Sequence, residues 1–151
     1  MTDPVTLGWL CAVEECAAIQ PLVQAHIDYE RSSTVMPADW SITVGQLIAA
    51  GDLVIVVAWL GASAVGYASV TTDVATWSGR RFAHLDCLFV AERYRGANIG
   101  RLLVDAVAEH VRSLGLQELQ WQTPDWNTGA IRFYERLGAT HRPKARFALT
   151  L

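Results

Sequence analysis

The sequence of 151 residues lacks several features that would place it in other classes of protein. It has no apolar run long enough to span a membrane, and its N-terminus has no basic segment followed by an apolar one, as a secretory leader would. It also has no excess of positive charge, because the formal net charge is −3 and the pI is near 5.7. We therefore expect a cytoplasmic protein with no membrane and no nucleic-acid partner.

Cysteine is scarce as well. Cys11, Cys16 and Cys87 are odd in number and lack the spacing of a metal site, so buried or unreactive thiols are the simplest interpretation, and no metal is expected. The chain also has no linker, internal repeat or low-complexity stretch. With 52% hydrophobic residues, it is expected to form a single domain over residues 1–151 with a sizeable core.

Apolar periodicity predicts alternating strands and helices. In chain order the expected elements are a strand at 4–13, helices at 14–31 and 37–50, strands at 53–60, 64–76 and 82–90, a helix at 99–114, a strand at 117–123, a helix that Asn127 or Asp125 opens and Gly138 ends, and two short strands around Pro143-Lys144.

The stretch Arg-Tyr-Arg-Gly-Ala-Asn-Ile-Gly-Arg-Leu-Leu-Val at 93–104 joins a glycine-containing turn to an amphipathic helix. The first turn of such a helix presents free N–H groups and the positive end of the helix dipole, which favours an anion. It is no Walker loop, since Arg101-Leu102 follows Gly100, and it has only two of the three glycines of a dinucleotide fingerprint. Taken alone, the stretch also fits an ordinary strand, turn and helix with a glycine corner.

This stretch resembles the pyrophosphate loop of the GNAT acetyltransferases, written Arg/Gln-x-x-Gly-x-Gly/Ala, with Arg95 and Gly100 at its ends. Asn98 replaces the usual middle glycine, and asparagine is among the residues that best tolerate a positive φ. Downstream, residues 127–138 resemble the GNAT pattern Asn-x-x-Ala-x-x-x-Tyr-x-x-x-Gly, with Ala130 and Tyr134 in place. The order and separation of both motifs identify the chain as a member of this family.

The resemblance implies an α/β fold of the α+β type. We expect one mixed central sheet of about six to seven strands flanked by about four helices, with a V-shaped splay that holds acetyl-CoA. Within the family the chain is most similar to diamine and polyamine acetyltransferases of the spermidine/spermine type, through Tyr29-Glu30, Asp86 before Val90, Trp126-Asn127, Phe133-Tyr134 and Gly138-Ala139. It departs from them where their usual glutamate is the shorter Asp86 and their next acid is Cys87.

This likeness implies transfer of acetyl from acetyl-CoA to a primary amine of a small cationic acceptor (a polyamine, a diamine or a lysine-like amine) by direct attack in a ternary complex. Tyr134 would protonate the leaving thiolate, and Asp86, through a water, or His84 would take the proton of the amine. The alternatives stay open: Tyr134 as core packing, Asp86 as a partner of Arg80 or Arg81, and His84 as a structural residue.

The remaining expected contacts also come from the resemblance. The expected acetyl-CoA site consists of Leu88, Phe89, Val90, Arg95, Gly96, Ala97, Asn98, Ile99, Gly100, Arg101, Asn127, Ala130 and Tyr134, with the backbone of 88–90 as oxyanion donor. The expected amine site consists of Tyr29, Glu30, Asp86, Trp121 and Trp126. A polar helix end explains Tyr29-Glu30 equally well, and core packing explains the two tryptophans.

Two further functions remain open, namely a sensor that binds acyl-CoA without turnover and an acetyltransferase for protein lysines or N-termini. We also expect a homodimer.

Overall fold

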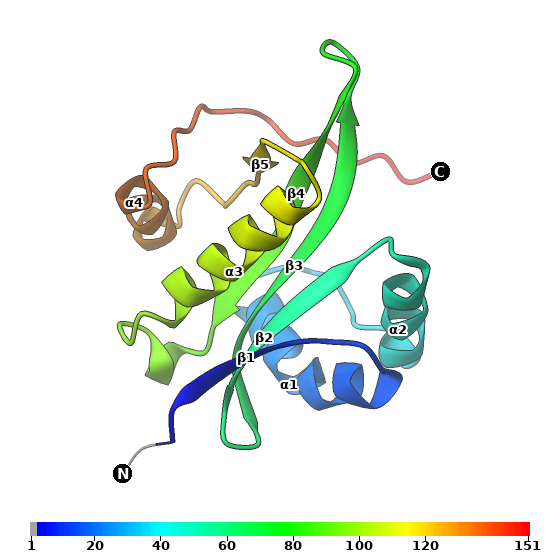
Figure 1. Cartoon of the computed structure of the whole chain (residues 1–151), viewed down its shortest axis with the longest axis vertical. Coiled ribbons are helices and arrows are strands. Elements are labelled where there is room, and N and C mark those ends of the chain that lie inside the picture. Colours follow the sequence, from blue (N-terminus) through cyan, green and yellow to red (C-terminus); the bar gives the residue numbers. More distant parts are fainter. Residues whose placement is uncertain (1–2) are drawn as a thin grey trace.

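The computed structural model describes residues 3–151, which form one five-stranded sheet with helices on both faces (Figure 1). The strands lie in the order β1-β2-β3-β4-β5. The first four pair antiparallel, whereas β4 and β5 pair parallel. Their bounds are β1 Val5–Trp9, β2 Val54–Leu60, β3 Ser63–Ala75, β4 Arg80–Val90 and β5 Leu119–Gln120. The sheet is mixed, as predicted.

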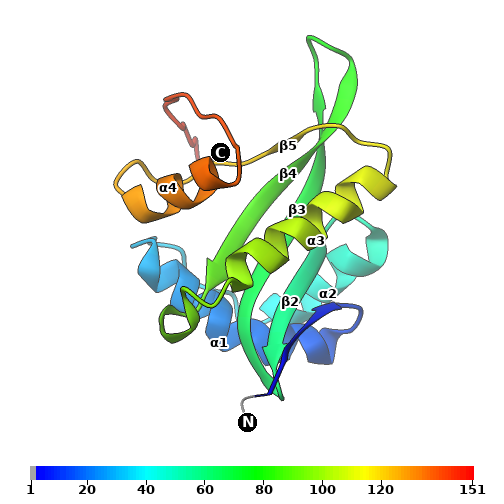
Figure 2. The same ribbon diagram turned by 60° about the vertical axis from the view of Figure 1, so that its left-hand side comes forward.

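Four α-helices cover the sheet, in agreement with the expected number. Helices α1 (Val13–Tyr29) and α2 (Trp40–Ala50) lie on one face, and α3 (Ile99–Ser113) lies on the other (Figure 2). The short α4 (Thr128–Arg136) follows β5, and a 3-10 turn at Glu92–Tyr94 joins β4 to the loop before α3. None of the helices in residues 3–151 has both the length and the apolar character needed to cross a membrane.

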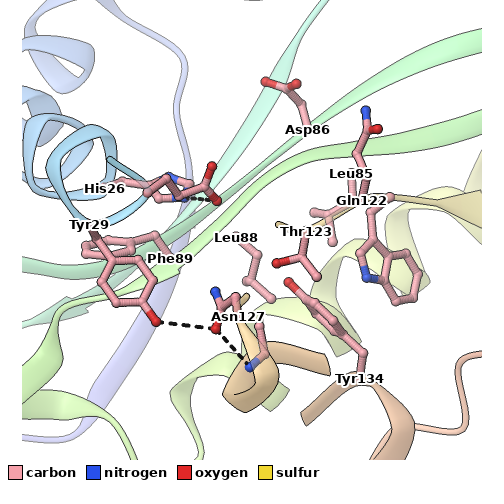
Figure 3. A pocket seen from close by; sticks show the side chains of 13 residues that line it. His26, Tyr29, Leu85, Asp86, Leu88, Phe89, Gln122, Thr123, Asn127 and Tyr134 are labelled. Atoms are coloured by element: carbon pink, nitrogen blue, oxygen red, sulfur yellow. Dashed lines mark hydrogen bonds and ion pairs between the residues drawn. The ribbon is translucent and has the colours of Figure 1, made fainter. Parts of the chain in front are cut away.

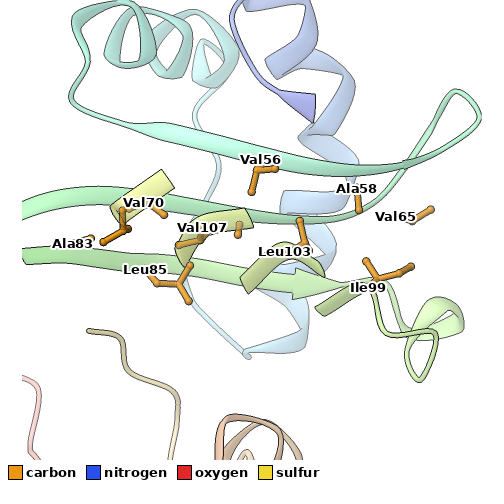
Figure 4. Packing of buried hydrophobic residues seen from close by; sticks show 11 residues of the cluster. Val56, Ala58, Val65, Val70, Ala83, Leu85, Ile99, Leu103 and Val107 are labelled. Carbon is orange, nitrogen blue, oxygen red and sulfur yellow. The ribbon is translucent and has the colours of Figure 1, made fainter. Parts of the chain in front are cut away.

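The central strands separate two hydrophobic cores because successive side chains of a strand point to opposite faces. On β2, Val56 and Ala58 belong to the core that α3 covers, whereas Ile55 and Val57 belong to the core under α1 and α2. Figure 4 shows Leu103 and Val107 of α3 among the strand residues of the first core. This burial of both faces explains why β2 reads as a continuous apolar run.

Strand β4 carries a bulge at Asp86. The register with β3 pairs Ser69 with Cys87 and Val70 with Leu85, so Asp86 is the extra residue. The bulge changes the alternation of faces, and as a result Leu85 and Leu88 both join the core on the α3 side.

Strand β5 pairs with β4 only at Ala83 and His84, which is far shorter than the strand expected at 117–123. Beyond Gln120 the chain leaves β4 and runs to α4 (Figure 2). Within residues 3–151, the second half of β4 therefore has no strand on this edge, and the expected V-shaped splay opens there.

The two strands expected around Pro143-Lys144 do not form, so the sheet has five strands and not six to seven. A strand needs an edge to pair with, and the two-residue β5 provides very little. Pro143 also lacks the N–H group that a ladder requires. The apolar side chains of this segment, Phe147, Leu149 and Leu151, are 91%, 83% and 110% exposed.

Candidate active site

The loop between β4 and α3 has the backbone of an anion site. Gly96 and Asn98 both adopt the left-handed conformation, with φ of 82° and 63°. Asn98 thus takes the conformation that its position in the motif requires. Leu102 is the first α3 residue whose N–H group makes a helical hydrogen bond; it donates to the Asn98 carbonyl at 3.1 Å. The N–H groups of Ile99, Gly100 and Arg101 remain for a ligand.

A groove runs from this loop to α4. Twelve of the thirteen residues expected to contact acetyl-CoA line it, all except Ala97. The sequence prediction missed Tyr94, Gly129, Phe133, Arg136 and Leu137, which line it as well. Phe133 and Arg136 of α4 and its C-cap Leu137 follow from helical spacing, because they lie one or two turns from Gly129 and Ala130 on the same face.

Glycine at position 100 allows α3 and α4 to approach each other. A Cβ atom there would lie 3.2 Å from Cζ of Phe133, which is closer than ordinary van der Waals contact. The last glycine of the loop motif thus serves the packing of two helices as well as the backbone at the groove.

A second, smaller pocket adjoins the groove (Figure 3). Its walls come from the end of α1, the bulged part of β4, the segment after β5, and α4; the residues are His26, Tyr29, Glu30, Leu85, Asp86, Leu88, Phe89, Trp121, Gln122, Thr123, Asn127, Ala130 and Tyr134. Four of the five residues expected at the amine site are present. Trp126 lines neither pocket, and neither does His84, the alternative base.

Tyr134 lies where the two pockets meet, since it lines both. Burial raises the pKa of its hydroxyl to about 12, and the charges of Glu30 and Cys87 contribute to this rise. The group therefore holds its proton near neutral pH. Its ring packs edge-on against Trp121, with centroids 5.2 Å apart.

Asn127 joins α4 to α1. Its Oδ1 accepts a hydrogen bond from the Ala130 N–H at 3.2 Å, which caps α4, and the Tyr29 hydroxyl donates to the same oxygen at 3.4 Å. Asn127 and not Asp125 is therefore the helix cap. Trp126 packs beside this contact, with its ring edge-on to Tyr29 and the Arg31 guanidinium 4.6 Å above it.

Arg95 connects the loop to Tyr29 at the smaller pocket. Its Nε donates to the Val90 carbonyl at 2.9 Å, and its guanidinium lies 4.3 Å from the centroid of the Tyr29 ring. The first residue of the loop motif thus helps to build the wall between the two pockets.

Asp86 has no ion pair with Arg80 or Arg81 in residues 3–151. Its Oδ2 accepts a weak hydrogen bond from the Cys87 thiol, at 3.6 Å. The carboxylate is exposed at the rim of the smaller pocket, and in Figure 3 it points away from the Tyr134 hydroxyl.

His26, in the last turn of α1, is a buried polar residue. Its Nδ1 lies 2.7 Å from the Tyr67 hydroxyl, and its Nε2 lies 3.1 Å from Glu30 Oε1. Burial lowers its pKa below the ordinary value of 6.5, although the Glu30 carboxylate opposes this shift. The imidazole is therefore neutral at pH 7.

This lowered pKa predicts a pH-dependent stability. Since folded His26 binds a proton less readily than unfolded His26, its contribution to stability is present above pH 6.5 and is lost as the pH falls through its folded pKa. Urea unfolding should show that wild type loses more stability than His26→Gln between neutral and mildly acidic pH. Equal losses in both proteins would contradict the prediction.

Comparison with known proteins agrees with this geometry. Residues 20–139 match the acetyltransferase (GNAT) family. The chain is 41% identical over 56 residues to L-ornithine N5-acetyltransferase NATA1 of Arabidopsis thaliana, covering 37% of this chain and 25% of that protein. It is 35% identical over 79 residues to thialysine N-epsilon-acetyltransferase of Bos taurus, covering 52% and 46%. The chain thus spans between a quarter and about half of the length of these curated relatives.

The fold has counterparts among solved structures. The aminoglycoside acetyltransferase meta-AAC0020 from an uncultured soil metagenomic sample superimposes with a TM-score of 0.83 at 19% identity, over 97% of this chain and 96% of that one. Glucosamine-6-phosphate N-acetyltransferase from Arabidopsis thaliana gives 0.78 at 16% identity, over 97% and 99%. These likenesses confirm the predicted fold. The family match over residues 20–139 shows that the chain belongs to the GNAT family of acetyltransferases.

Proposed function

We propose that this protein is an acetyl-CoA-dependent N-acetyltransferase that acts on a primary amine of a small cationic acceptor. The observation that carries the proposal is the meeting of two pockets at Tyr134, one beside a phosphate-type loop and one with acidic walls. The named relatives, which acetylate ornithine and thialysine, support an amine acceptor.

The donor would lie in the groove. Its pyrophosphate would accept hydrogen bonds from the loop and the first turn of α3, and its thioester would reach β4 beside Tyr134. The second half of β4 has no strand on its outer edge, so the N–H groups of 88–90 that point to this side are free to bind the thioester oxygen. No metal is part of this chemistry.

The acceptor would enter the smaller pocket. A free alkylamine has a pKa of about 10.4, so it arrives protonated and must lose a proton before it attacks. The resemblance to polyamine acetyltransferases favours Asp86, through a water, as the base. The structure places a second carboxylate, Glu30, in the same pocket. Both negative charges favour a cationic amine.

In the transfer step the amine nitrogen attacks the thioester carbon, and the C–N bond forms as the C–S bond breaks. The thiolate of CoA takes a proton from the Tyr134 hydroxyl, and the second proton of the nitrogen passes, directly or through water, to the tyrosinate that this leaves. The raised pKa of Tyr134 keeps that proton available. A sensor that only binds acyl-CoA would need neither this tyrosine nor the acidic walls.

A panel of amines tests the proposal. With acetyl-CoA as donor, turnover should be fastest with diamines, polyamines and lysine-like amines, slower with neutral amines, and the preference should weaken as salt screens the carboxylates. CoA binding without turnover on any amine would favour the sensor, and turnover on lysine peptides alone would favour a protein acetyltransferase. Absence of CoA binding would refute the whole assignment.

We also propose that the protein is a homodimer in the cytoplasm. The alternating apolar side chains Phe147, Leu149 and Leu151 are exposed, and a second copy of the chain could bury them. Sedimentation should show a dimer for wild type and a monomer for Phe147→Glu, whereas an unchanged dimer would place the interface elsewhere. The free thiols of Cys11, Cys16 and Cys87 support the proposal that the protein resides in the reducing cytoplasm.

A further inference from the structure

A line of hydrogen-bonded side chains leads from the sheet into the amine pocket. It begins at Tyr67 on β3, passes through the His26 ring, and ends at Glu30 on the last turn of α1. His26 is 9% exposed and Tyr67 is 3% exposed; His26 and Glu30 line the pocket, whereas Tyr67 lies behind them. The His26 ring also stacks on Phe89 of β4, with centroids 4.8 Å apart and an interplanar angle of 16°.

The contacts determine which nitrogen of His26 carries the proton. Burial raises the pKa of Tyr67 far above its ordinary value, so its hydroxyl stays protonated. A carboxylate can only accept, which requires an N–H at Nε2 facing Glu30. In the neutral ring Nδ1 is then the acceptor, and the Tyr67 hydroxyl donates to it.

This arrangement leaves one Glu30 oxygen for a ligand. His26 holds Oε1, and in residues 3–151 Oε2 has no hydrogen-bond partner. The side chain of Glu30 is 39% exposed. Its negative charge contributes to the raised pKa of the Tyr134 hydroxyl. Glu30 and Tyr134 thus line the same pocket. The Asp86 carboxylate, by contrast, points away from the Tyr134 hydroxyl (Figure 3).

We propose that Glu30 takes the proton of the acceptor amine, and that His26, braced by Tyr67, is the positioning residue that holds its carboxylate. The proposal rests on the acetyltransferase function above. The ammonium group gives one proton to Oε2 of Glu30, directly or through a water, and the neutral amine then attacks the thioester. Glu30 thus replaces Asp86, the base that the resemblance favours, and Asp86 contributes negative charge to the pocket.

The proposal explains why the imidazole is buried and neutral. The groups that face His26 are Glu30 on α1, Tyr67 on β3, Asp86 on β4 and Arg95 after β4. Protonation of His26 would place a positive charge beside Glu30, which weakens it as a base and repels the ammonium group. Activity should therefore fall on the acid side as His26 gains its proton.

Steady-state kinetics with acetyl-CoA and a diamine test the proposal. Glu30→Gln should lower kcat by about 10²-fold, a typical loss for a general base. His26→Leu should lower it by about tenfold to 10²-fold, because the carboxylate loses its fixed position. His26→Gln should recover most of this loss, since its side-chain amide can donate to Oε1. Asp86→Asn, the matched control, should mainly raise KM.

Two measurements separate this role from a purely structural one. The acid limb of the wild-type pH profile should disappear in His26→Gln, and nitrogen-15 NMR of wild type should show the His26 proton on Nε2. A raised KM with unchanged kcat in Glu30→Gln, an equal loss in both His26 variants, or a proton on Nδ1 would overturn the proposal. An inactive wild-type protein would instead refute the proposed function itself.

Discussion

Replacing Tyr134 with phenylalanine should lower kcat by about 10²- to 10⁴-fold, the usual effect of losing a general acid. The hydroxyl lies where the two pockets meet, and its raised pKa keeps it protonated until the thiolate departs. Without it the thiolate must leave as an anion in a partly desolvated site. Because the interaction is needed mainly in the transition state, the affinity for acetyl-CoA should stay nearly the same.

The ring of Tyr134 provides the control for this experiment. It packs against Trp121 and Phe133, and phenylalanine keeps both contacts, so the melting temperature of Tyr134→Phe should match that of wild type. Rapid-quench measurement of a single turnover would show whether the chemical step itself is slower. An unchanged rate at saturating substrates would mean that Tyr134 serves only in packing.

Gly100→Pro should abolish CoA binding, with a loss of affinity of about 10²-fold or more. Proline removes the N–H group of residue 100 from the anion site and disfavours the helical conformation of Ile99 before it. Its ring would also press on Phe133, which lies 3.2 Å from the position of a Cβ atom. Both the loop and the contact of α3 with α4 would change.

Two milder variants serve as controls and are compared by calorimetry. Gly100→Ala keeps the N–H group and adds only the contact with Phe133, so it should weaken CoA binding modestly. Arg101→Ala should change the CoA affinity only slightly, because the Arg101 guanidinium is exposed and forms an ion pair with Asp105 at 3.1 Å. Full CoA affinity in a folded Gly100→Pro protein would contradict the proposed role of the loop.

Much of the donor site could be predicted from the sequence because it depends on neighbouring residues. The left-handed turn at Gly96 and Asn98, the free first turn of α3, and the Asn127 cap on the Ala130 N–H all involve residues within one turn of each other. Such features follow from residue type and helical spacing. For the same reason the four helices and the central strands lie close to their predicted ranges.

The contacts within the amine site could not be predicted without the tertiary structure. The Tyr67 hydroxyl meets His26 across 41 residues of sequence, and Tyr29 meets Asn127 across 98. Nothing in the local pattern indicates these pairs. The bulge that makes Asp86 the extra residue of β4 depends on its register with β3, which is likewise a property of two distant segments.

The predicted number of strands was wrong because strand pairing also depends on segments that are distant in the sequence. Whether residues 117–123 and the segment around Pro143-Lys144 form strands depends on a free sheet edge within reach, not on their own alternation. The splay leaves β5 two residues long, so the segment after α4 pairs with no strand in residues 3–151. The sequence alone thus predicted the family, the anion-binding loop before α3, and Tyr134 as the candidate general acid. Only the packing of distant segments decided which carboxylates and which histidine line the pocket beside that tyrosine.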